Sequence, residues 1–339
     1  MNRSDLGLMS LASLLFTLAL AFPCGVAAQN LVTGDTSIVV PGSRVELLFD
    51  GAFFTEGPAV GPDGSVYFSD ITFTFRTDMQ AGHIWRYNPR TGQTSIFRSP
   101  SGMANGIIFD LEDRMVVAEG ADFGGRRVTR TDLATGKSEI LAGLFNGRSF
   151  NAPNDLTIDE QGRIYFTDPR YLGHEPIEQP VMGVYRIDPD GAVSLVLTDA
   201  GKPNGILISP DQRTLYVAAL DDGGLGTLPL NMSAFPGRQG LLAYDLHVDG
   251  TTTFREEVVS EFGPDGMAID VEENLYLTRE SGIEVYSPSG VKLAEIPLPA
   301  PVRNVTFGRN QAERTLYITA GGSLYSITVK KKGYHATRH

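Results

Sequence analysis

Six side chains that carry oxygen recur along this chain, each at the start of a similar sequence segment. They are Glu56, Asn105, Asn154, Asn204, Asp265 and Asn304. Successive members are 49, 49, 50, 61 and 39 residues apart. Carboxylate and amide oxygens without nitrogen or sulfur are typical ligands of hard cations. If these six residues, the openers, converge in space, their chemistry predicts a site for Ca²⁺, or for Mg²⁺ or Mn²⁺, rather than for zinc.

Two of the six openers are carboxylates, which would balance the charge of one divalent cation. Ca²⁺ is favoured because amide oxygens from separate segments do not easily impose the regular octahedron that Mg²⁺ requires. The alternative is that these residues only form the hydrogen-bonded turns that precede strands. That alternative explains Glu56 and Asp265 less well, because two carboxylates facing each other would repel without a cation.

The segments behind the openers predict how the openers are positioned. Each contains a short apolar run, a turn built from Asp, Gly, Asn or Pro, and a second apolar run, which indicates two strands joined by a tight turn. A period of about 40 to 50 residues, with room for two weaker strands, is typical of propeller blades. We therefore expect residues 44–329 to form one all-β, six-bladed β-propeller, with the openers at one mouth of its central channel.

The two ends of the chain complete this expected architecture. The last copy offers only three strands, whereas Arg44 to Phe49 alternates and has no partner nearby. We expect this segment to join the sixth blade as its outer strand and to close the ring. Residues 29–43 show no periodicity and predict a linker. The basic, polar residues 330–339 predict a frayed, flexible tail.

Residues 1–28 predict a cleavable signal peptide, because an apolar run from Leu8 to Phe22 precedes small residues at 26–28. A membrane anchor is the alternative, but the run is shorter than the ~20 residues that span a bilayer. Cleavage would remove Cys24, the single cysteine, and this fits a periplasmic or secreted protein without disulfides. The formal charge of −12 disfavours nucleic acid and anionic membranes as partners.

Three long connections are expected at the same mouth as the openers, over residues 70–82, 168–182 and 219–240. Long loops over a polar centre usually form the walls of a ligand pocket. The first contains Phe73 and Phe75, and the second contains Arg170, Tyr171 and His174, which we take as candidate substrate-binding residues. Each loop alone is also compatible with a variable surface loop. The sequence has no Gly-x-Ser-x-Gly elbow and no Gly-rich phosphate loop, so serine-triad hydrolysis is unsupported.

Four of the motifs resemble those of the senescence marker protein, gluconolactonase and luciferin-regenerating enzyme family of six-bladed propellers. They are Glu56-Gly57-Pro58, Asn154-Asp155-Leu156, Pro203-Asn204-Gly205 and Pro264-Asp265-Gly266-Met267, in the order of the family. The stretch from Tyr165 to Tyr171 is most similar to the bacterial gluconolactonases.

The resemblance implies one catalytic divalent cation, commonly Ca²⁺, held by Glu56, Asn154, Asn204 and Asp265. Asn105 lies in a further copy, as a ligand, a substrate contact or a turn residue. The resulting hypothesis is hydrolysis of a sugar lactone, with the metal polarising the carbonyl. Asp265 would activate water, and direct nucleophilic attack by Asp265 is the alternative. Coordination lowers the basicity of a carboxylate, which opposes the first role unless the metal also acidifies the water.

Two other functions fit the same sequence. One is an organophosphate hydrolase that uses the same cation, since a lactone and a phosphotriester both present an oxygen to a metal. The other is a non-catalytic propeller that binds Ca²⁺ or serves as a scaffold, because a fold does not by itself imply a function.

Overall fold

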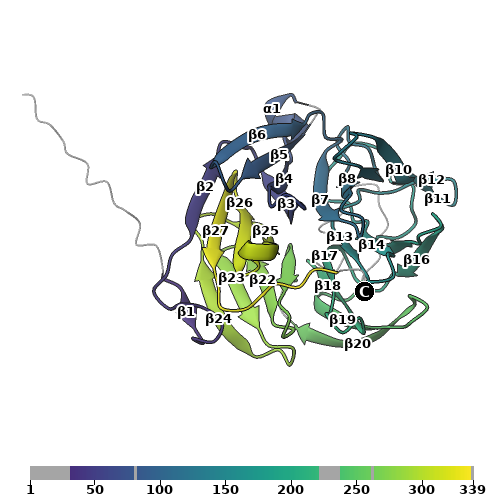
Figure 1. Ribbon diagram of the computed structural model, residues 1–339. Helices are drawn as coiled ribbons and strands as arrows, with labels where there is room; N and C mark the ends of the chain where they lie inside the picture. Colours follow the sequence, from purple (N-terminus) through teal and green to yellow (C-terminus); the bar gives the residue numbers. More distant parts are fainter. Residues whose placement is uncertain (1–30, 80–81, 221–236, 261–262, 337–339) are drawn as a thin grey trace, which may run out of the picture.

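The computed structural model describes residues 31–79, 82–220, 237–260 and 263–336, which form six antiparallel sheets around a central axis (Figure 1). The predicted all-β, six-bladed propeller is confirmed. Over the described residues, α1 (Thr74–Thr77) is the only α-helix and η2 (Asn310–Ala312) is a single 3-10 turn. No helix in this part of the chain is long and apolar enough to cross a membrane. The expected signal peptide, residues 1–28, lies outside the described residues.

Each blade places its first strand beside the axis, and the first strands of successive blades contact one another around the ring. Blades one to three consist of β3 (Thr55–Val60), β4 (Val66–Asp70), β5 (His83–Asn88) and β6 (Gln93–Arg98); β7 (Ala104–Phe109), β8 (Met115–Glu119), β9 (Arg127–Thr131) and β10 (Ser138–Ala142); and β13 (Leu156–Ile158), β14 (Ile164–Thr167), β15 (Val184–Ile187) and β16 (Val193–Leu197). Blades four to six contain β17 (Pro203–Ile208), β18 (Thr214–Ala219), β19 (Gly240–Leu246) and β20 (Thr252–Val259); β21 (Met267–Ile269), β22 (Leu275–Arg279), β23 (Gly282–Tyr286) and β24 (Lys292–Pro297); and β25 (Val302–Phe307), β26 (Thr315–Ala320) and β27 (Ser323–Thr328). A small hairpin of β11 (Leu144–Phe145) and β12 (Arg148–Ser149) lies between blades two and three in sequence.

The ring is closed by an N-terminal strand, as predicted. β2 (Glu46–Asp50) pairs antiparallel with β27, so that Glu46 lies opposite Ser326 and Leu47 opposite Tyr325. The sixth blade is therefore built from both ends of the propeller. This pairing covers the edge that β27 would otherwise expose.

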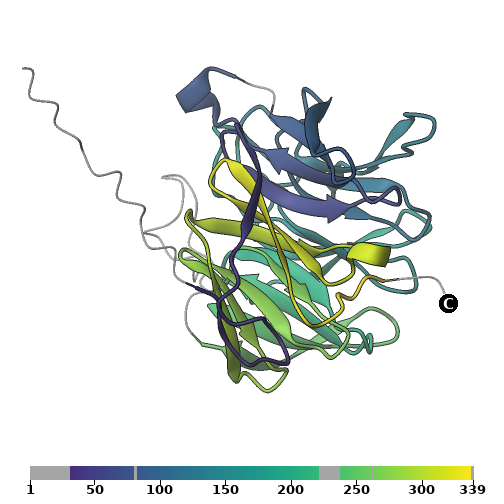
Figure 2. The same ribbon diagram turned by 60° about the vertical axis from the view of Figure 1, so that its left-hand side comes forward.

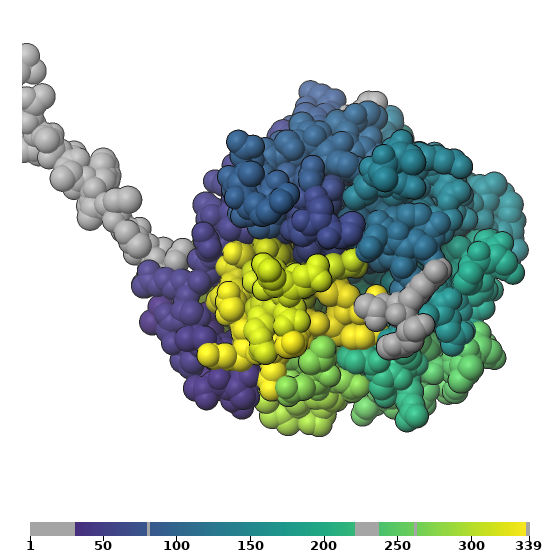
Figure 3. All heavy atoms as spheres, viewed as in Figure 1, coloured from purple at the N-terminus to yellow at the C-terminus, as the bar shows by residue number. Residues whose placement is uncertain are grey.

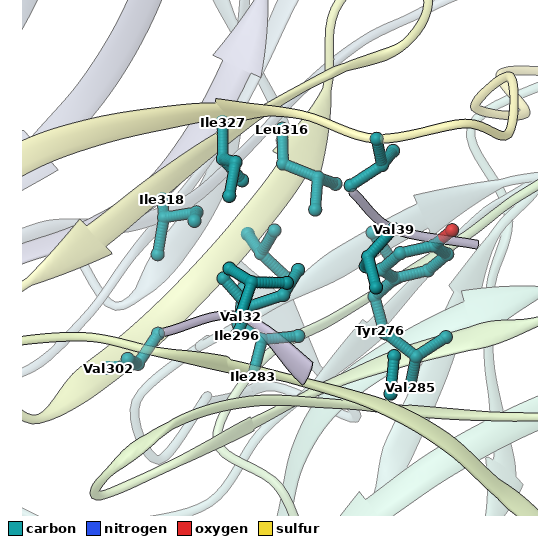
Figure 4. Close-up of a cluster of buried hydrophobic side chains, with 14 of the residues drawn as sticks. Val32, Val39, Tyr276, Ile283, Val285, Ile296, Val302, Leu316, Ile318 and Ile327 are labelled. Carbon is teal, nitrogen blue, oxygen red and sulfur yellow. The ribbon is translucent and has the colours of Figure 1, made fainter. Parts of the chain in front are cut away.

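The residues that precede β2 do not form the expected linker. β1 (Thr33–Gly34) pairs with β24 as a fifth strand of blade five. Val32 and Val39 are buried against Ile283 of blade five and Leu316 of blade six, as Figure 4 shows. Burying a Val or Ile side chain contributes about 1.5–3 kcal/mol. The apolar residues of this segment stand in two short groups, at 31–32 and 38–40, without a regular period, and for this reason the sequence did not reveal its packing.

The C-terminal residues also differ from the expected frayed tail. Over the described part, residues 330–336, the backbone N–H of Gly333 donates to Glu313 O at 2.7 Å and that of Tyr334 to Ile269 O at 3.0 Å. The Tyr334 hydroxyl donates to Glu160 Oε1 at 3.0 Å and accepts from Gln212 Nε2 at 2.8 Å. These partners belong to turns and strands of four different blades, so the tail is anchored across the propeller.

This anchored tail covers one end of the central channel. Tyr334, His335 and Ala336 line the same cavity of about 140 Å³ as the inner strands of the propeller. In Figure 3 the yellow C-terminal residues lie over the middle of this face. Figure 2 shows α1 on the opposite face. We call the face with the tail the lower mouth of the channel and the face with α1 the upper mouth.

Candidate metal and substrate site at the upper mouth

Five of the six openers meet at the upper mouth. Glu56, Asn105 and Asn204 are the second residues of β3, β7 and β17, while Asn154 and Asp265 lie two residues before β13 and β21. All five line one cavity of about 240 Å³. Asn304 does not line this cavity but the channel below it, together with Asp155. The structure thus brings together the four predicted metal ligands and Asn105, and it separates Asn304 from them.

A glycine after the opener allows this convergence. A Cβ atom added at Gly106 would lie 2.7 Å from Asn154 O, and one at Gly205 would lie 2.6 Å from Asp265 O. A Cβ atom added at Gly57 would lie closer still to the backbone carbonyl oxygen of Asn105. The residue after each of these openers is therefore in contact with the opener of the next blade. Only a residue without a side chain permits that approach.

Hydroxyl groups on the second strands also hold the openers in place. Ser69 Oγ of β4 donates to Asn105 O at 2.6 Å, and Thr167 Oγ1 of β14 donates to Asn204 O at 2.7 Å. All four residues are buried. Each hydrogen bond crosses from one blade to the opener of the next, so the spacing of the blades fixes the backbone on which the site is built.

Buried carboxylates after Ser69 and Thr167 fix the segments that lead into the openers. Asp168 accepts hydrogen bonds from the backbone N–H groups of Asn151 and Ala152, both at 2.8 Å, ahead of Asn154. Asp70 accepts the backbone N–H of Phe54 at 2.9 Å, ahead of Glu56. Burial raises the pKa of Asp168 to about 7, although these backbone donors oppose the rise. Both carboxylates position the site without lining the cavity.

Three carboxyl groups near the channel axis have raised pKa values, so that their environment disfavours the charged form. Burial raises the pKa of Glu56 well above its usual range, and the nearby charges of Asp265 and Asp155 raise it further. Burial also raises the pKa of Asp265 to about 6, whereas Arg303 and a hydrogen bond from Asn204 oppose the rise. The pKa of Asp155 is raised to about 7, again mainly by burial. A divalent cation between Glu56 and Asp265 would reverse this, because its charge stabilises both carboxylates.

The donor set fits a hard cation. Asn105 Oδ1 is buried and accepts no hydrogen bond, and such a group is costly unless something else satisfies it. The described residues contain no cluster of three or more His, Cys, Asp or Glu side chains suited to a metal. Among the five openers at this cavity, two are carboxylates and the other three carry amide oxygens. That composition suits Ca²⁺ better than a transition metal.

Arg303 is a member of the site that the sequence did not reveal. Its Nη1 lies 3.6 Å from Asp265 Oδ2 and donates to Glu280 Oε1 at 3.2 Å. Its guanidinium also lies 5.1 Å from the centre of the Phe54 ring. A signal was present, because Arg303 directly precedes an opener, where the other copies have Thr, Ala or Pro.

The predicted substrate-binding residues of the second long connection differ in whether they line the cavity. Tyr171 lines the cavity; its hydroxyl donates to Lys202 O and accepts from Asn204 Nδ2, both at 3.3 Å. His174 does not line the cavity, and its side chain is 57% exposed, 4.0 Å from Asp122. Asp122, which does line the cavity, was not singled out from the sequence.

Arg170 is not a substrate contact in this structure. It is 1% exposed and lies outside the cavity lining. Its Nε donates to Asn151 O at 3.1 Å and its Nη1 to Glu175 O at 3.0 Å. Burial lowers the pKa of Arg170, and the charge of Arg126 lowers it further. Arg170 therefore holds the connection between β14 and β15 against the segment that leads to Asn154. Much of the third expected wall, residues 221–236, lies outside the described residues.

Comparison with known proteins identifies the family to which this chain is similar. A family model described as the SMP-30/Gluconolactonase/LRE-like region matches residues 54–322. A gluconolactonase from Zymomonas mobilis is 28% identical over 344 residues, covering 91% of this chain and 90% of that protein. A pentonolactonase from Haloferax volcanii is 24% identical over 272 residues, covering 77% of this chain and 81% of that protein.

Solved structures with a similar fold include proteins of the same kinds. A gluconolactonase from Xanthomonas campestris is 27% identical and superposes with a TM-score of 0.73, covering 89% of this chain and 94% of that one. A luciferin-regenerating enzyme shares the fold, with a TM-score of 0.67 at 18% identity, over 87% of this chain and 98% of that one. The family match covers most of the propeller, including every opener. The chain belongs to the SMP-30/gluconolactonase/LRE-like family.

Proposed function

We propose that this protein is a divalent-cation-dependent lactone hydrolase whose site is the upper mouth of the propeller. The observation that carries the proposal is the convergence of five oxygen-bearing side chains on one cavity, two of them carboxylates and one with a buried, unpartnered oxygen. Relatives named gluconolactonase and pentonolactonase support lactones as the substrate class.

Four residues would hold the cation, namely Glu56, Asn154, Asn204 and Asp265. Asn105 Oδ1 is a candidate for a fifth ligand. Ca²⁺ is the proposed ion, with Mg²⁺ and Mn²⁺ as alternatives, because amide oxygens on separate blades favour a cation that tolerates irregular coordination. When bound, the cation supplies Lewis acidity toward the lactone carbonyl oxygen and lowers the pKa of a water.

Asp265 is the proposed general base. Its side chain is 16% exposed and borders the cavity, whereas Glu56 is 4% exposed as a whole residue. Asp265 would take a proton from water while the water oxygen bonds to the carbonyl carbon. The ring C–O bond then breaks and the leaving alkoxide recovers the proton from Asp265. Direct attack by the carboxylate is the alternative, and it would form an anhydride that water must cleave.

The test is hydrolysis of glucono-1,5-lactone by the chain from residue 29 onward, followed with a pH indicator. Activity is expected to disappear with a chelator and to return with one added cation. A phosphotriester assayed in parallel separates the lactonase from a phosphotriester hydrolase. Metal binding without hydrolysis of either substrate would favour the non-catalytic, cation-binding propeller, and neither metal nor hydrolysis would favour the scaffold.

We also propose that the protein is exported from the cytoplasm. Residues 1–28 support a cleaved signal peptide and a periplasmic or secreted enzyme. N-terminal sequencing of the exported protein should begin at Gln29. A mature protein that retains Cys24 would contradict this.

A further inference from the structure

Over the residues that the structure describes, the cavity at the upper mouth has a polar floor and a largely apolar wall. The openers form the floor. The connections of blades one to four contribute large apolar side chains to the wall. They are Phe54, Ile71, Phe73, Met103, Leu172 and Leu220. A substrate bound above the openers would contact mainly carbon on these sides.

Aromatic rings continue the wall from the cavity to the surface. Phe54 and Phe73 pack edge to face with ring centres 4.9 Å apart, and Phe73 packs on Phe75 at 5.7 Å. Phe75 is 67% exposed and Leu172 is 37% exposed. Exposed apolar side chains that adjoin a cavity often belong to a binding surface.

In the part of the wall that the structure describes, most polar groups already have partners within the protein, although Arg303 Nε is buried without a hydrogen bond. Asp122 Oδ2 accepts the backbone N–H of Thr74 at 3.0 Å. The Tyr171 hydroxyl both donates and accepts, and Arg303 pairs with Asp265 and Glu280. A polyhydroxylated ring placed here would lose hydrogen bonds to water without regaining them all. An alkyl or aryl group would lose none and would bury apolar surface.

We propose that the preferred substrate is a lactone whose ring carries an apolar alkyl or aryl substituent. The ester group faces the openers and the substituent lies against Phe54, Phe73 and Leu172. This inference rests on the proposed lactone hydrolysis. It differs from the sugar lactone expected from the sequence, because it is argued from the wall of the cavity rather than from the openers.

A series of γ-lactones tests the inference, namely γ-butyrolactone, γ-hexalactone and γ-octalactone, with glucono-1,5-lactone as the polar reference. We expect kcat/KM to rise about fifteenfold for every two carbons added, since each buried methylene contributes roughly a fourfold preference. We also expect γ-octalactone to exceed glucono-1,5-lactone. A flat or falling series, or a preference for glucono-1,5-lactone, overturns the inference and leaves the lactonase proposal standing.

A pair of leucine variants assigns the effect to the wall. In Leu172→Ser we expect the increase of kcat/KM with chain length to weaken. Leu144→Ser is the matched control, because Leu144 is 58% exposed on β11 and outside the cavity. Equal slopes in both variants would overturn the role of Leu172 and the placement of the substituent. Failure to cleave any lactone would overturn both this inference and the proposed function.

Discussion

The two mouths of the channel are built by the same inner strands but differ in what their polar groups contact. At the lower mouth the tail supplies partners, as when the Tyr334 hydroxyl donates to Glu160 and accepts from Gln212. At the upper mouth Asn105 Oδ1 remains buried without a partner, and Glu56 faces Asp265. Burial without a partner costs about 1–3 kcal/mol for a neutral polar group and more for a charged one. The upper mouth therefore carries the cost that a bound cation and substrate would offset.

The difference indicates that the two ends of each repeat serve different purposes, one for stability and the other for ligand binding. Tight turns at the lower mouth and the anchored tail stabilise the ring. At the upper mouth, longer connections surround a cavity whose floor is left for a ligand. Substitutions at the upper mouth should thus affect turnover more than stability, and those at the lower mouth the reverse.

The largest expected effect follows from Asp265→Asn. The amide keeps an oxygen for a cation but cannot accept a proton from water, so kcat at saturating calcium should fall about 10³-fold. The variant should still bind calcium, at weaker affinity because a carboxylate ligand has lost its charge. Turnover and calcium binding are measured on the same sample. Asp113→Asn is the matched control at the lower mouth, where Asp113 is exposed and pairs with Arg309 at 3.0 Å. More than about a tenth of the wild-type turnover in Asp265→Asn would refute its role as the base.

A smaller effect is expected from Gly106→Ala. The new Cβ would meet Asn154 O at 2.7 Å and displace that opener. We expect kcat/KM to fall about 10- to 100-fold because a small misplacement of site groups is costly, with a loss of about 1–3 kcal/mol in the free energy of unfolding. Gly143→Ala is the control, since its nearest neighbour would be Ile140 Cγ2 at 3.5 Å. Unchanged kinetics would show that the glycine does not position the site.

The smallest effect concerns stability at the lower mouth. Burial and, to a smaller extent, the charge of Arg309 lower the pKa of His335 from 6.5 to about 4. Because the folded pKa lies below the unfolded value, the unfolded chain takes up the proton first as the pH falls. The contribution of His335 to the free energy of unfolding is therefore fully present above about pH 6.5. It is lost as the pH falls toward 4, by at most about 3 kcal/mol. Urea unfolding should show a smaller loss in His335→Gln than in the wild type or in His247→Gln, whose histidine is exposed. Equal losses in all three proteins would contradict this.

The sequence predicted the floor of the site because the residues that form it belong to a short motif that recurs in every blade. Each opener recurs at blade spacing, and a glycine often follows, so position in the repeat implies position at the axis. Arg303 has the same kind of location, but its effect on Asp265 depends on the contact between blades five and six. The prediction that Arg170 contacts the substrate was wrong because the side chains of neighbouring loop residues project to different sides. Tyr171 lines the cavity, whereas Arg170 points into the protein.

The ends of the chain were predicted less well for another reason. Residues 31–39 and 330–336 pack through a few apolar contacts and backbone hydrogen bonds to distant blades. Such segments have no period of their own, because the propeller surface supplies the geometry. Only β2, whose alternation matches a strand, was recognised, and it pairs with β27 as expected.

The most direct test of a cation-dependent site at the upper mouth is the calcium dependence of lactone hydrolysis in chelator-treated wild type and Glu56→Gln. We expect no turnover without added cation in the wild type and saturation by one Ca²⁺ per chain. The curve of Glu56→Gln should shift to about tenfold or more higher calcium, because a carboxylate ligand has lost its charge. Turnover of the stripped wild type, or superimposable curves for the two proteins, would contradict a cation site built on Glu56.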